Sequence, residues 1–302
     1  MRFSAWPTAA HTWPDLRDLS LHAESVGFDG IWVMDHFMDN TAVGGGDVHE
    51  CFSLLAALAA VVPRVRLGTL VAGNTYRHPA VVANQACTID HISGGRFVLG
   101  LGAGWQRNEH EQYGIELPAI GPLLRRFEEA CRVVKGLRDA EVTDLDGSFY
   151  QLTSARMDPK PVGPMPLLIG GSGEKVMAGI IARQADEWNV WGDPKVFAHK
   201  TGVMTAACER EGRDPATLVR SVQARIVLRH PGRMVSDLGD LVTLGDGRTI
   251  GGSLEQLRDT MGRYAAAGAD EFIVLDGHLG GDPARSRELW DLVATEVVPQ
   301  FR

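Results

Sequence analysis

The amino-acid sequence predicts an α/β fold, a (β/α)8 TIM barrel with loop insertions at its C-terminal face. Three observations predict it: short apolar runs alternate with longer helix-like patterns, eight such pairs occur within 302 residues, and no linker separates them. Repeated strand–helix pairs imply parallel strands with right-handed crossovers, which place the helices outside a closed sheet. We therefore expect residues 1–302 to form one domain, with a doubly wound open sheet as the alternative.

Each expected strand is a short apolar run bounded by turn residues. The expected strands are residues 3–5, 30–34, 65–71, 96–101, 167–170, 187–190, 219–228 and 271–275. The helices between them carry apolar residues at helical spacing. Three such stripes are Leu16, Leu19, Ala23 and Val26, then Leu54, Leu55, Leu58 and Val61, and then Phe127, Cys131, Val134 and Leu137. In a barrel of this kind, functional residues occupy the loops that follow the strands.

Composition narrows the class of protein. With 44% hydrophobic and 23% charged residues, the chain matches a globular protein with a large core. A net charge of −8 disfavours nucleic acid as a partner. No apolar run reaches the roughly 18 residues of a membrane span, and the first residues lack a secretory signal. We expect a cytoplasmic protein that acts on a small molecule.

The cysteines do not predict a disulfide framework or a metal site. They are widely separated, at Cys51, Cys87, Cys131 and Cys208. We expect each to be a small buried apolar residue. His49 and Glu50 directly precede Cys51, so on a helix the three side chains would point in different directions. We therefore expect no metal.

The loop after the fourth strand is rich in glycine, reading GAGWQRNE over residues 102–109. Glycines let a backbone approach a ligand closely, while Trp105 offers a flat wall and Asn108 a polar group. The alternative is that Gly100, Gly102 and Gly104 only form a tight turn. Because Trp105 stands where a dinucleotide-binding pattern needs glycine, a Rossmann site is disfavoured.

Two other loops carry charged residues. Asp35 and His36 follow the second strand, where a charged pair would be costly if buried and idle. Alternatively, Asp35 caps local backbone and His36 is structural. Arg77 follows the third strand, just before a helix entry at Pro79, and either binds a ligand or pairs with an acid.

The segment GGSGEKV at residues 170–176 precedes a helix that we expect to run through Ala185. Free N–H groups and the positive end of the helix dipole favour a phosphate there, although the spacing is not that of a Walker loop. Trp188 and Trp191 are three positions apart and should face opposite sides of the sixth strand, one in the core and one in a pocket wall. Together these features favour a planar, phosphorylated cofactor.

An ordered set of motifs resembles the bacterial luciferase-like superfamily, and more narrowly its branch that uses the deazaflavin coenzyme F420. The motifs are GFDGIW at 27–32, DH at 35–36, LGT at 67–69, HPA at 78–80, SGGR at 93–96, LGLGAGW at 99–105 and GGSG at 170–173. The similarity extends to about Trp191, with a weaker match over 251–275.

The resemblance implies roles for individual residues and a homodimer. Asp35 would contact the cofactor ring, and His36 would transfer a proton. The Leu70–Val71 peptide bond would be cis and bulge against the ring. The remaining cofactor contacts would come from Gly104, Trp105, Asn108, Gly171, Ser172 and Gly173, beside the pocket wall expected at Trp191.

Two departures from related sugar-phosphate dehydrogenases disfavour glucose 6-phosphate as substrate. Those enzymes have a catalytic glutamate where this chain has Trp105, and Lys195 is the only nearby basic candidate for a sugar phosphate. A mouth lined by Trp6, Trp105, Trp188 and Trp191 would fit a less polar molecule.

The resulting hypothesis is hydride transfer between coenzyme F420 and an unidentified small organic substrate, with His36 moving the proton. The first alternative is an FMN-dependent luciferase-like monooxygenase. The second is a non-catalytic flavin- or deazaflavin-binding protein. The glycine-rich segment 230–248 is either a lid over the substrate or a surface loop.

Overall fold

The computed structural model describes residues 1–41, 43–229, 231, 234–235, 245–276 and 282–302. Within them, parallel strands close into the predicted eight-stranded barrel, since β1 pairs with both β2 and β12, and β9 pairs with β10. The barrel strands are β1 (Arg2–Trp6), β2 (Gly30–Val33), β3 (Arg66–Thr69), β5 (Phe97–Gly102), β8 (Leu167–Gly170), β9 (Glu187–Trp191), β10 (Val219–Leu228) and β12 (Glu271–Leu275).

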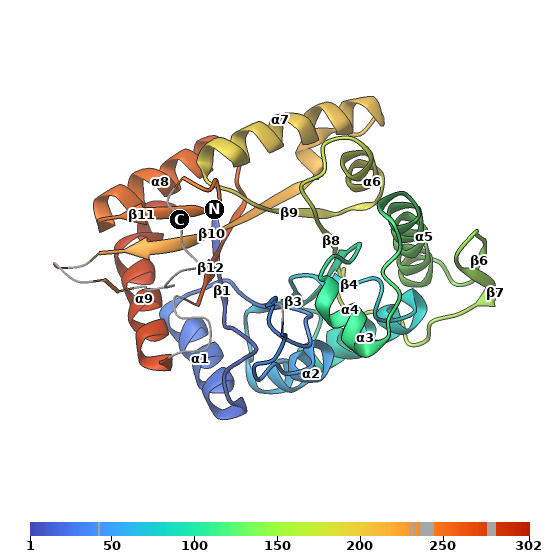
Figure 1. The fold of residues 1–302 in the computed structure, drawn as a ribbon, viewed down its shortest axis with the longest axis horizontal. Coiled ribbons are helices and arrows are strands. Elements are labelled where there is room, and N and C mark those ends of the chain that lie inside the picture. The colour runs from blue at the N-terminus through green and yellow to red at the C-terminus, as the bar shows by residue number, and fades with distance from the viewer. Residues whose placement is uncertain (42, 230, 232–233, 236–244, 277–281) are drawn as a thin grey trace.

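Helices surround the strands (Figure 1). They are α1 (Trp13–Val26), α2 (Cys51–Val61), α3 (Pro79–Ser93), α5 (Ile120–Asp139), α6 (Val176–Gln184), α7 (Pro194–Arg210), α8 (Leu254–Ala266) and α9 (Pro283–Glu296). The insertions are β4 (Ala72–Gly73), α4 (Arg107–Tyr113), β11 (Thr249–Gly252) and the hairpin of β6 (Thr143–Asp146) and β7 (Gln151–Ala155). Short 3-10 turns occur at Pro215–Thr217 and Val298–Gln300.

Local sequence accounts for several helix ends. The Thr12 side chain accepts a hydrogen bond from the first turn of α1, which ends at Gly27 in a left-handed conformation with φ of 100°. Glu50 caps α2 through two backbone N–H groups. Ser253 and Gln256 form a reciprocal capping box at the start of α8. These caps place the helices directly after the loops that carry functional groups.

The core has two layers. The outer layer, between strands and helices, contains the predicted stripes, with the corrections that Val26 is only partly buried and that Val61 at the end of α2 is 37% exposed. The inner layer fills the barrel with Trp32, Leu70, Val98, Leu168 and Ile273. All four cysteines are buried free thiols, as expected, and burial raises the pKa of the Cys51 and Cys131 thiols.

Ion pairs close the N-terminal end of the barrel. Arg66 Nη2 lies 2.7 Å from Glu187 Oε1, and Arg66 Nη1 lies 3.2 Å from Glu271 Oε2. Trp32 Nε1 donates to Glu271 Oε1 at 2.9 Å. Because these groups occupy one end of the barrel, the opposite end is formed by the loops that follow the strands.

None of the helices in the described part of the chain combines the length and apolar character that a membrane crossing requires.

Candidate active site

A cavity of about 740 Å³ lies at the C-terminal ends of the strands. This volume lies within the range of small-molecule sites. Most of the residues expected to form the site line it, namely Asp35, His36, Leu70, Val71, Gly104, Trp105, Gly171, Ser172 and Trp191. Asn108 and Gly173 are not among its described lining residues.

The Leu70–Val71 peptide bond is cis, as the resemblance implied. The Val71 side chain packs against glycines of the neighbouring strands. A Cβ added at Gly102 would lie 2.8 Å from Val71 Cγ2, and one at Gly170 would lie 3.0 Å from Val71 Cγ1. A Cβ at Gly100 would overlap the Thr69 carbonyl oxygen.

The structure separates the roles of these glycines. Gly100 and Gly102 lie within β5, so they form no turn, and both make room for Thr69 and Val71, while Gly102 also lines the cavity. Gly104, with φ of 102°, is the position where the chain does turn.

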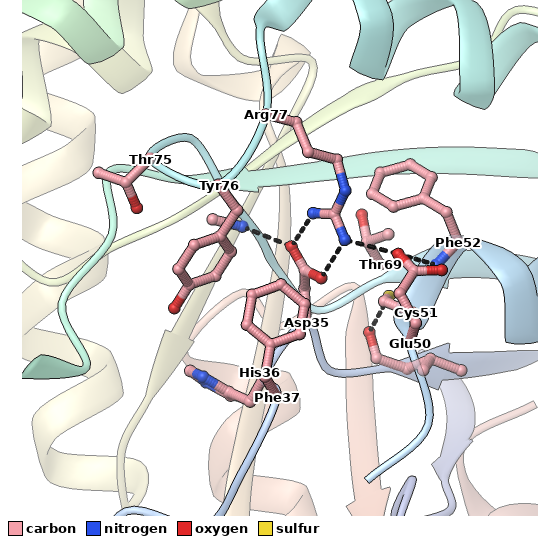
Figure 2. A network of polar contacts seen from close by, with 12 residues as sticks. Asp35, His36, Phe37, Glu50, Cys51, Phe52, Thr69, Thr75, Tyr76 and Arg77 are labelled. Carbon is pink, nitrogen blue, oxygen red and sulfur yellow. Dashed lines mark hydrogen bonds and ion pairs between the residues drawn. The ribbon is translucent and has the colours of Figure 1, made fainter. Parts of the chain in front are cut away.

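Asp35 forms the centre of a buried ion-pair network (Figure 2). Arg77 Nη1 and Nη2 lie 2.7 and 3.0 Å from its two carboxylate oxygens, and the Gly73 N–H donates at 3.0 Å. Arg77 Nη2 also lies 2.5 Å from Glu50 Oε1. Of the two sequence alternatives for Arg77, pairing with an acid is thus the one observed, and the Asp35 carboxylate also holds local backbone.

The contacts of this network favour the charged forms of Arg77 and Glu50. Burial acts to lower the pKa of the Arg77 guanidinium, but the hydrogen bonds and charges of Asp35 and Glu50 raise it above its ordinary value. Burial acts to raise the pKa of Glu50, yet the hydrogen bonds at the start of α2 and the Arg77 charge hold it low. The group is therefore a charged support of the cavity wall, which Asp35 itself lines.

His36 points away from this network (Figure 2) and meets a residue that sequence reasoning missed. Its Nδ1 lies 2.7 Å from Oε1 of Glu109, in α4. The N–H of Phe37 donates to Glu109 Oε2 at 2.8 Å, and the Tyr76 hydroxyl donates to Glu109 Oε1. The sequence pattern that could have indicated Glu109 is an acidic residue in the first turn of a short helix directly after the glycine-rich loop.

The same contacts set the charge of Glu109. Burial acts to raise its pKa, but the hydrogen bonds from His36, Phe37 and Tyr76 bring the pKa below its ordinary value. Burial, followed by the bond to Glu109, raises the pKa of the Tyr76 phenol far above its usual range. The carboxylate is therefore ionised and Tyr76 neutral near pH 7. The Trp105 ring lies edge-on to His36, with centroids 5.5 Å apart.

The predicted phosphate loop precedes α6. Gly171 and Ser172 line the cavity, and Lys175 at the helix start provides no side-chain cap. Lys200 Nζ donates to Ser172 O and Glu174 Oε1, each at 2.7 Å. Lys200 on α7 is therefore a basic residue beside this loop, whereas Lys195, the candidate considered for a sugar phosphate, does not line the cavity.

Trp188 and Trp191 face opposite sides of β9, as predicted. Trp188 is 1% exposed, and its Nε1 donates to Gly171 O at 2.9 Å. Trp191 lines the cavity beside Trp6, with ring centroids 5.8 Å apart. The aromatic mouth thus consists of Trp6, Trp105 and Trp191, without Trp188.

The remaining predicted features are peripheral or undescribed. Asn108 Nδ2 donates to the carbonyl oxygens of Asp39 and Thr41, so it holds the loop after β2.

Within the segment expected to form a lid or surface loop, residues 230, 232–233 and 236–244 lie outside the described residues. Asp246 and Arg248 at its end line the cavity. Among the described residues, no cluster of three or more His, Cys, Asp or Glu side chains could hold a metal ion.

Comparison with known proteins identifies the family. A family model described as luciferase-like monooxygenase matches residues 1–233. The chain belongs to this family. Pyrimidine monooxygenase RutA of Cronobacter sakazakii is 37% identical over 177 residues, covering 56% of this chain and 51% of the relative. RutA of Escherichia coli K12 is 38% identical over 177 residues, covering 56% and 46%. This luciferase-like chain spans about half the length of these curated relatives.

Solved structures share its fold. A coenzyme F420-dependent tetrahydromethanopterin reductase from Methanopyrus kandleri superposes with a TM-score of 0.83 at 18% identity, covering 100% of this chain and 99% of that one. An F420-dependent secondary alcohol dehydrogenase, solved with an F420-acetone adduct, gives 0.84 at 19% identity, covering 100% of both. Monooxygenase RslO1 from Streptomyces bottropensis gives 0.81 at 18%, again covering 100% of both. At these identities, the similarity concerns the fold.

Proposed function

We propose that this luciferase-like protein transfers a hydride between coenzyme F420 and a small organic substrate, with His36 moving the accompanying proton. The observation that carries the proposal is the His36–Glu109 pair at the cavity, with Nδ1 and Oε1 2.7 Å apart. Nδ1 is engaged by Glu109, whereas Nε2 has no hydrogen-bond partner among the described residues. Nε2 is therefore the ring nitrogen that can exchange a proton with substrate.

The residues present fit a flavin-like cofactor. The cavity is large enough, Val71 and the glycine-rich strands give it a smooth wall, and the Ser172 loop with Lys200 beside it suits a phosphate. When bound, a deazaflavin supplies hydride transfer. Leu70, Val71, Gly104 and Trp105 would line its ring, while Gly171, Ser172 and Gly173 would bind its phosphate.

The protein's own groups would supply positioning and proton handling. The ionised Glu109 holds the His36 ring in one orientation through Nδ1. Asp35 acts through Arg77 and the Gly73 backbone, so we assign it a positioning role at the wall rather than a proton-transfer role. Asn108 supports the site through the carbonyl oxygens of Asp39 and Thr41.

A second candidate is an FMN-dependent monooxygenase. The specific observation in its favour is the 37–38% identity to relatives named pyrimidine monooxygenase, over 177 residues. The same cavity and phosphate loop would accept FMN. The two candidates differ in whether reduced cofactor is consumed by oxygen or by an organic substrate.

Calorimetric titration of the purified apoprotein with F420 and with FMN is the first test. Preference for F420 at micromolar affinity, followed by anaerobic turnover in a panel of alcohols and ketones, would support hydride transfer. Preference for FMN, with oxygen uptake in the presence of reduced FMN, would favour the second candidate. Tight binding without turnover in either assay would indicate a carrier protein, and binding of neither would contradict both enzyme proposals.

We also propose a homodimer, as the resemblance implies. Sedimentation equilibrium measures the mass directly: a species of twice 32.7 kDa is expected, and a monomer at micromolar concentration would contradict it.

A further inference from the structure

One residue that lines the cavity, Gln223, carries a buried polar atom with no partner among the described residues. Gln223 lies on β10, is 2% exposed and lines the cavity. Its Oε1 is enclosed and has no hydrogen-bond partner among the residues that the structure describes. A buried carboxamide oxygen without a donor is unfavourable. Half a turn about the last side-chain torsion would bring this oxygen to the cavity, where a ligand can supply the donor.

The surroundings of Gln223 are flat and aromatic. Its partner in the β9–β10 register is Trp191. The Trp6 ring adjoins the Trp191 ring at an interplanar angle of 57°, so the two indoles form neighbouring walls. Arg225 lies over the Trp191 ring, 5.6 Å from its centroid, and pairs with Asp246. Such walls suit a planar, uncharged ligand.

Gln223 also lies across the barrel from the glycine-rich wall. In the closed sheet, β10 is four strands from β3 in either direction. The strand β3 leads into Leu70 and Val71, whose side chains pack toward β5 and β8. The cavity therefore has a smooth half at β3, β5 and β8, and a half with indoles and a carboxamide at β1, β9 and β10.

A carboxamide presents an N–H donor and a carbonyl acceptor side by side. Its complement is the edge of a cyclic amide or imide, where an N–H adjoins a C=O. We propose that Gln223, with Trp6 and Trp191, forms a subsite that recognises the amide or imide edge of a planar uncharged ligand. The inference rests on the proposed function, because that edge belongs either to the substrate or to the ring of the bound cofactor.

Calorimetry with uracil and with 1,3-dimethyluracil tests the subsite. The two probes share a ring, but methylation removes both N–H donors. Uracil should bind the wild-type protein, and 1,3-dimethyluracil should bind about tenfold more weakly or not at all. Gln223→Met, which keeps the side-chain length and removes the hydrogen bonds, should weaken uracil binding by a similar factor.

The matched control is Gln85→Met. Gln85 on α3 also has an unpartnered Oε1, but it does not line the cavity, so its replacement should leave both probes unaffected. Circular dichroism melts of both variants check folding, and the comparison of the two probes on the wild-type protein needs no variant.

Affinities of F420 and FMN for Gln223→Met identify the source of the edge. Weakened uracil binding with unchanged cofactor binding assigns the subsite to the substrate, whereas cofactor binding weakened about tenfold assigns it to the ring. If Gln223→Met changes neither uracil binding nor cofactor binding, the subsite does not exist as proposed. If uracil binding depends on Gln223 while neither cofactor binds at all, the subsite stands and the proposed function fails.

Discussion

Nδ1 of His36 and Oε1 of Glu109 lie 2.7 Å apart although 73 positions separate the two residues. His36 lies three residues after the end of β2, and Glu109 lies in the first turn of the short helix α4 after β5. The contact links two loops at the cavity mouth and leaves the far side of the imidazole to the cavity. It is the feature on which the functional proposal depends most.

His36→Ala should separate binding from chemistry. We expect F420 affinity to stay within about threefold, because other residues form the proposed ring and phosphate contacts, and turnover to fall about 10²- to 10⁴-fold. Calorimetry measures the F420 affinity, and the change in cofactor absorbance measures turnover. His22→Ala is the control, since His22 pairs with Asp291 outside the cavity. Unchanged turnover in His36→Ala would remove the histidine from the mechanism.

Glu109→Gln should destabilise the protein in a pH-dependent way. The folded-state pKa of Glu109 lies below its ordinary value of 4.5. As pH falls, the unfolded chain therefore binds the proton first, so the ionised carboxylate stabilises the fold above that value and loses its contribution as pH drops through the folded pKa. Urea unfolding at neutral pH and at progressively lower pH should show the wild-type advantage shrinking. The exposed Glu111→Gln should show no such trend, and a constant advantage for Glu109 would argue against the assignment.

Arg77→Met should be strongly destabilising, by about 3–5 kcal/mol, because it leaves the Asp35 carboxylate buried without its cation. The Asp35 side chain is 0% exposed and that of Arg77 is 14% exposed. The double variant Asp35→Asn with Arg77→Met should lose less than the sum of the single losses. Chemical denaturation gives all four free energies of unfolding. Additive losses would show that the pair is not coupled.

Gly100→Ala should prevent the wall of the cavity from forming as described. The new Cβ would overlap the Thr69 carbonyl oxygen, which cannot move without shifting β3 against β5. We expect a loss of at least about 2 kcal/mol and weaker cofactor binding. Gly202→Ala in α7, where nothing lies within 4 Å of the added Cβ, should instead stabilise by up to about 1 kcal/mol. Equal effects of the two substitutions on thermal unfolding would contradict this account.

Removing the phosphate from the ligand should test the loop before α6. Riboflavin should bind at least about tenfold more weakly than FMN if the Ser172 loop holds the phosphate. Lys200→Met should reduce that difference, because its ammonium lies against Ser172 O. Lys195→Met on the same helix should not, since Lys195 does not line the cavity. Equal affinities for riboflavin and FMN would mean that the loop has another role.

Much of the architecture was predictable because it depends on local periodicity. Alternating apolar runs predicted the barrel strands, and apolar stripes at helical spacing predicted the helices between them. The position of Asp35 and His36 after a strand placed them at the mouth before any contact was known. The three-residue spacing of Trp188 and Trp191 likewise indicated opposite faces.

The partners of these residues required the fold. Sequence named Arg77, but its pairing with Asp35 and Glu50 arises because the loop before α3 meets both ends of the loop between β2 and α2. Glycines 100 and 102 suggested a ligand loop, whereas β5 lies so close to Thr69 and Val71 that no Cβ fits. The sequence by itself determined which segments form strands and helices and which loops face the mouth. Only the tertiary structure decided that Glu109 meets His36 and that Gln223 Oε1 meets no donor among the described residues, because closing the sheet sets which distant positions come within hydrogen-bond distance, and periodicity does not encode this.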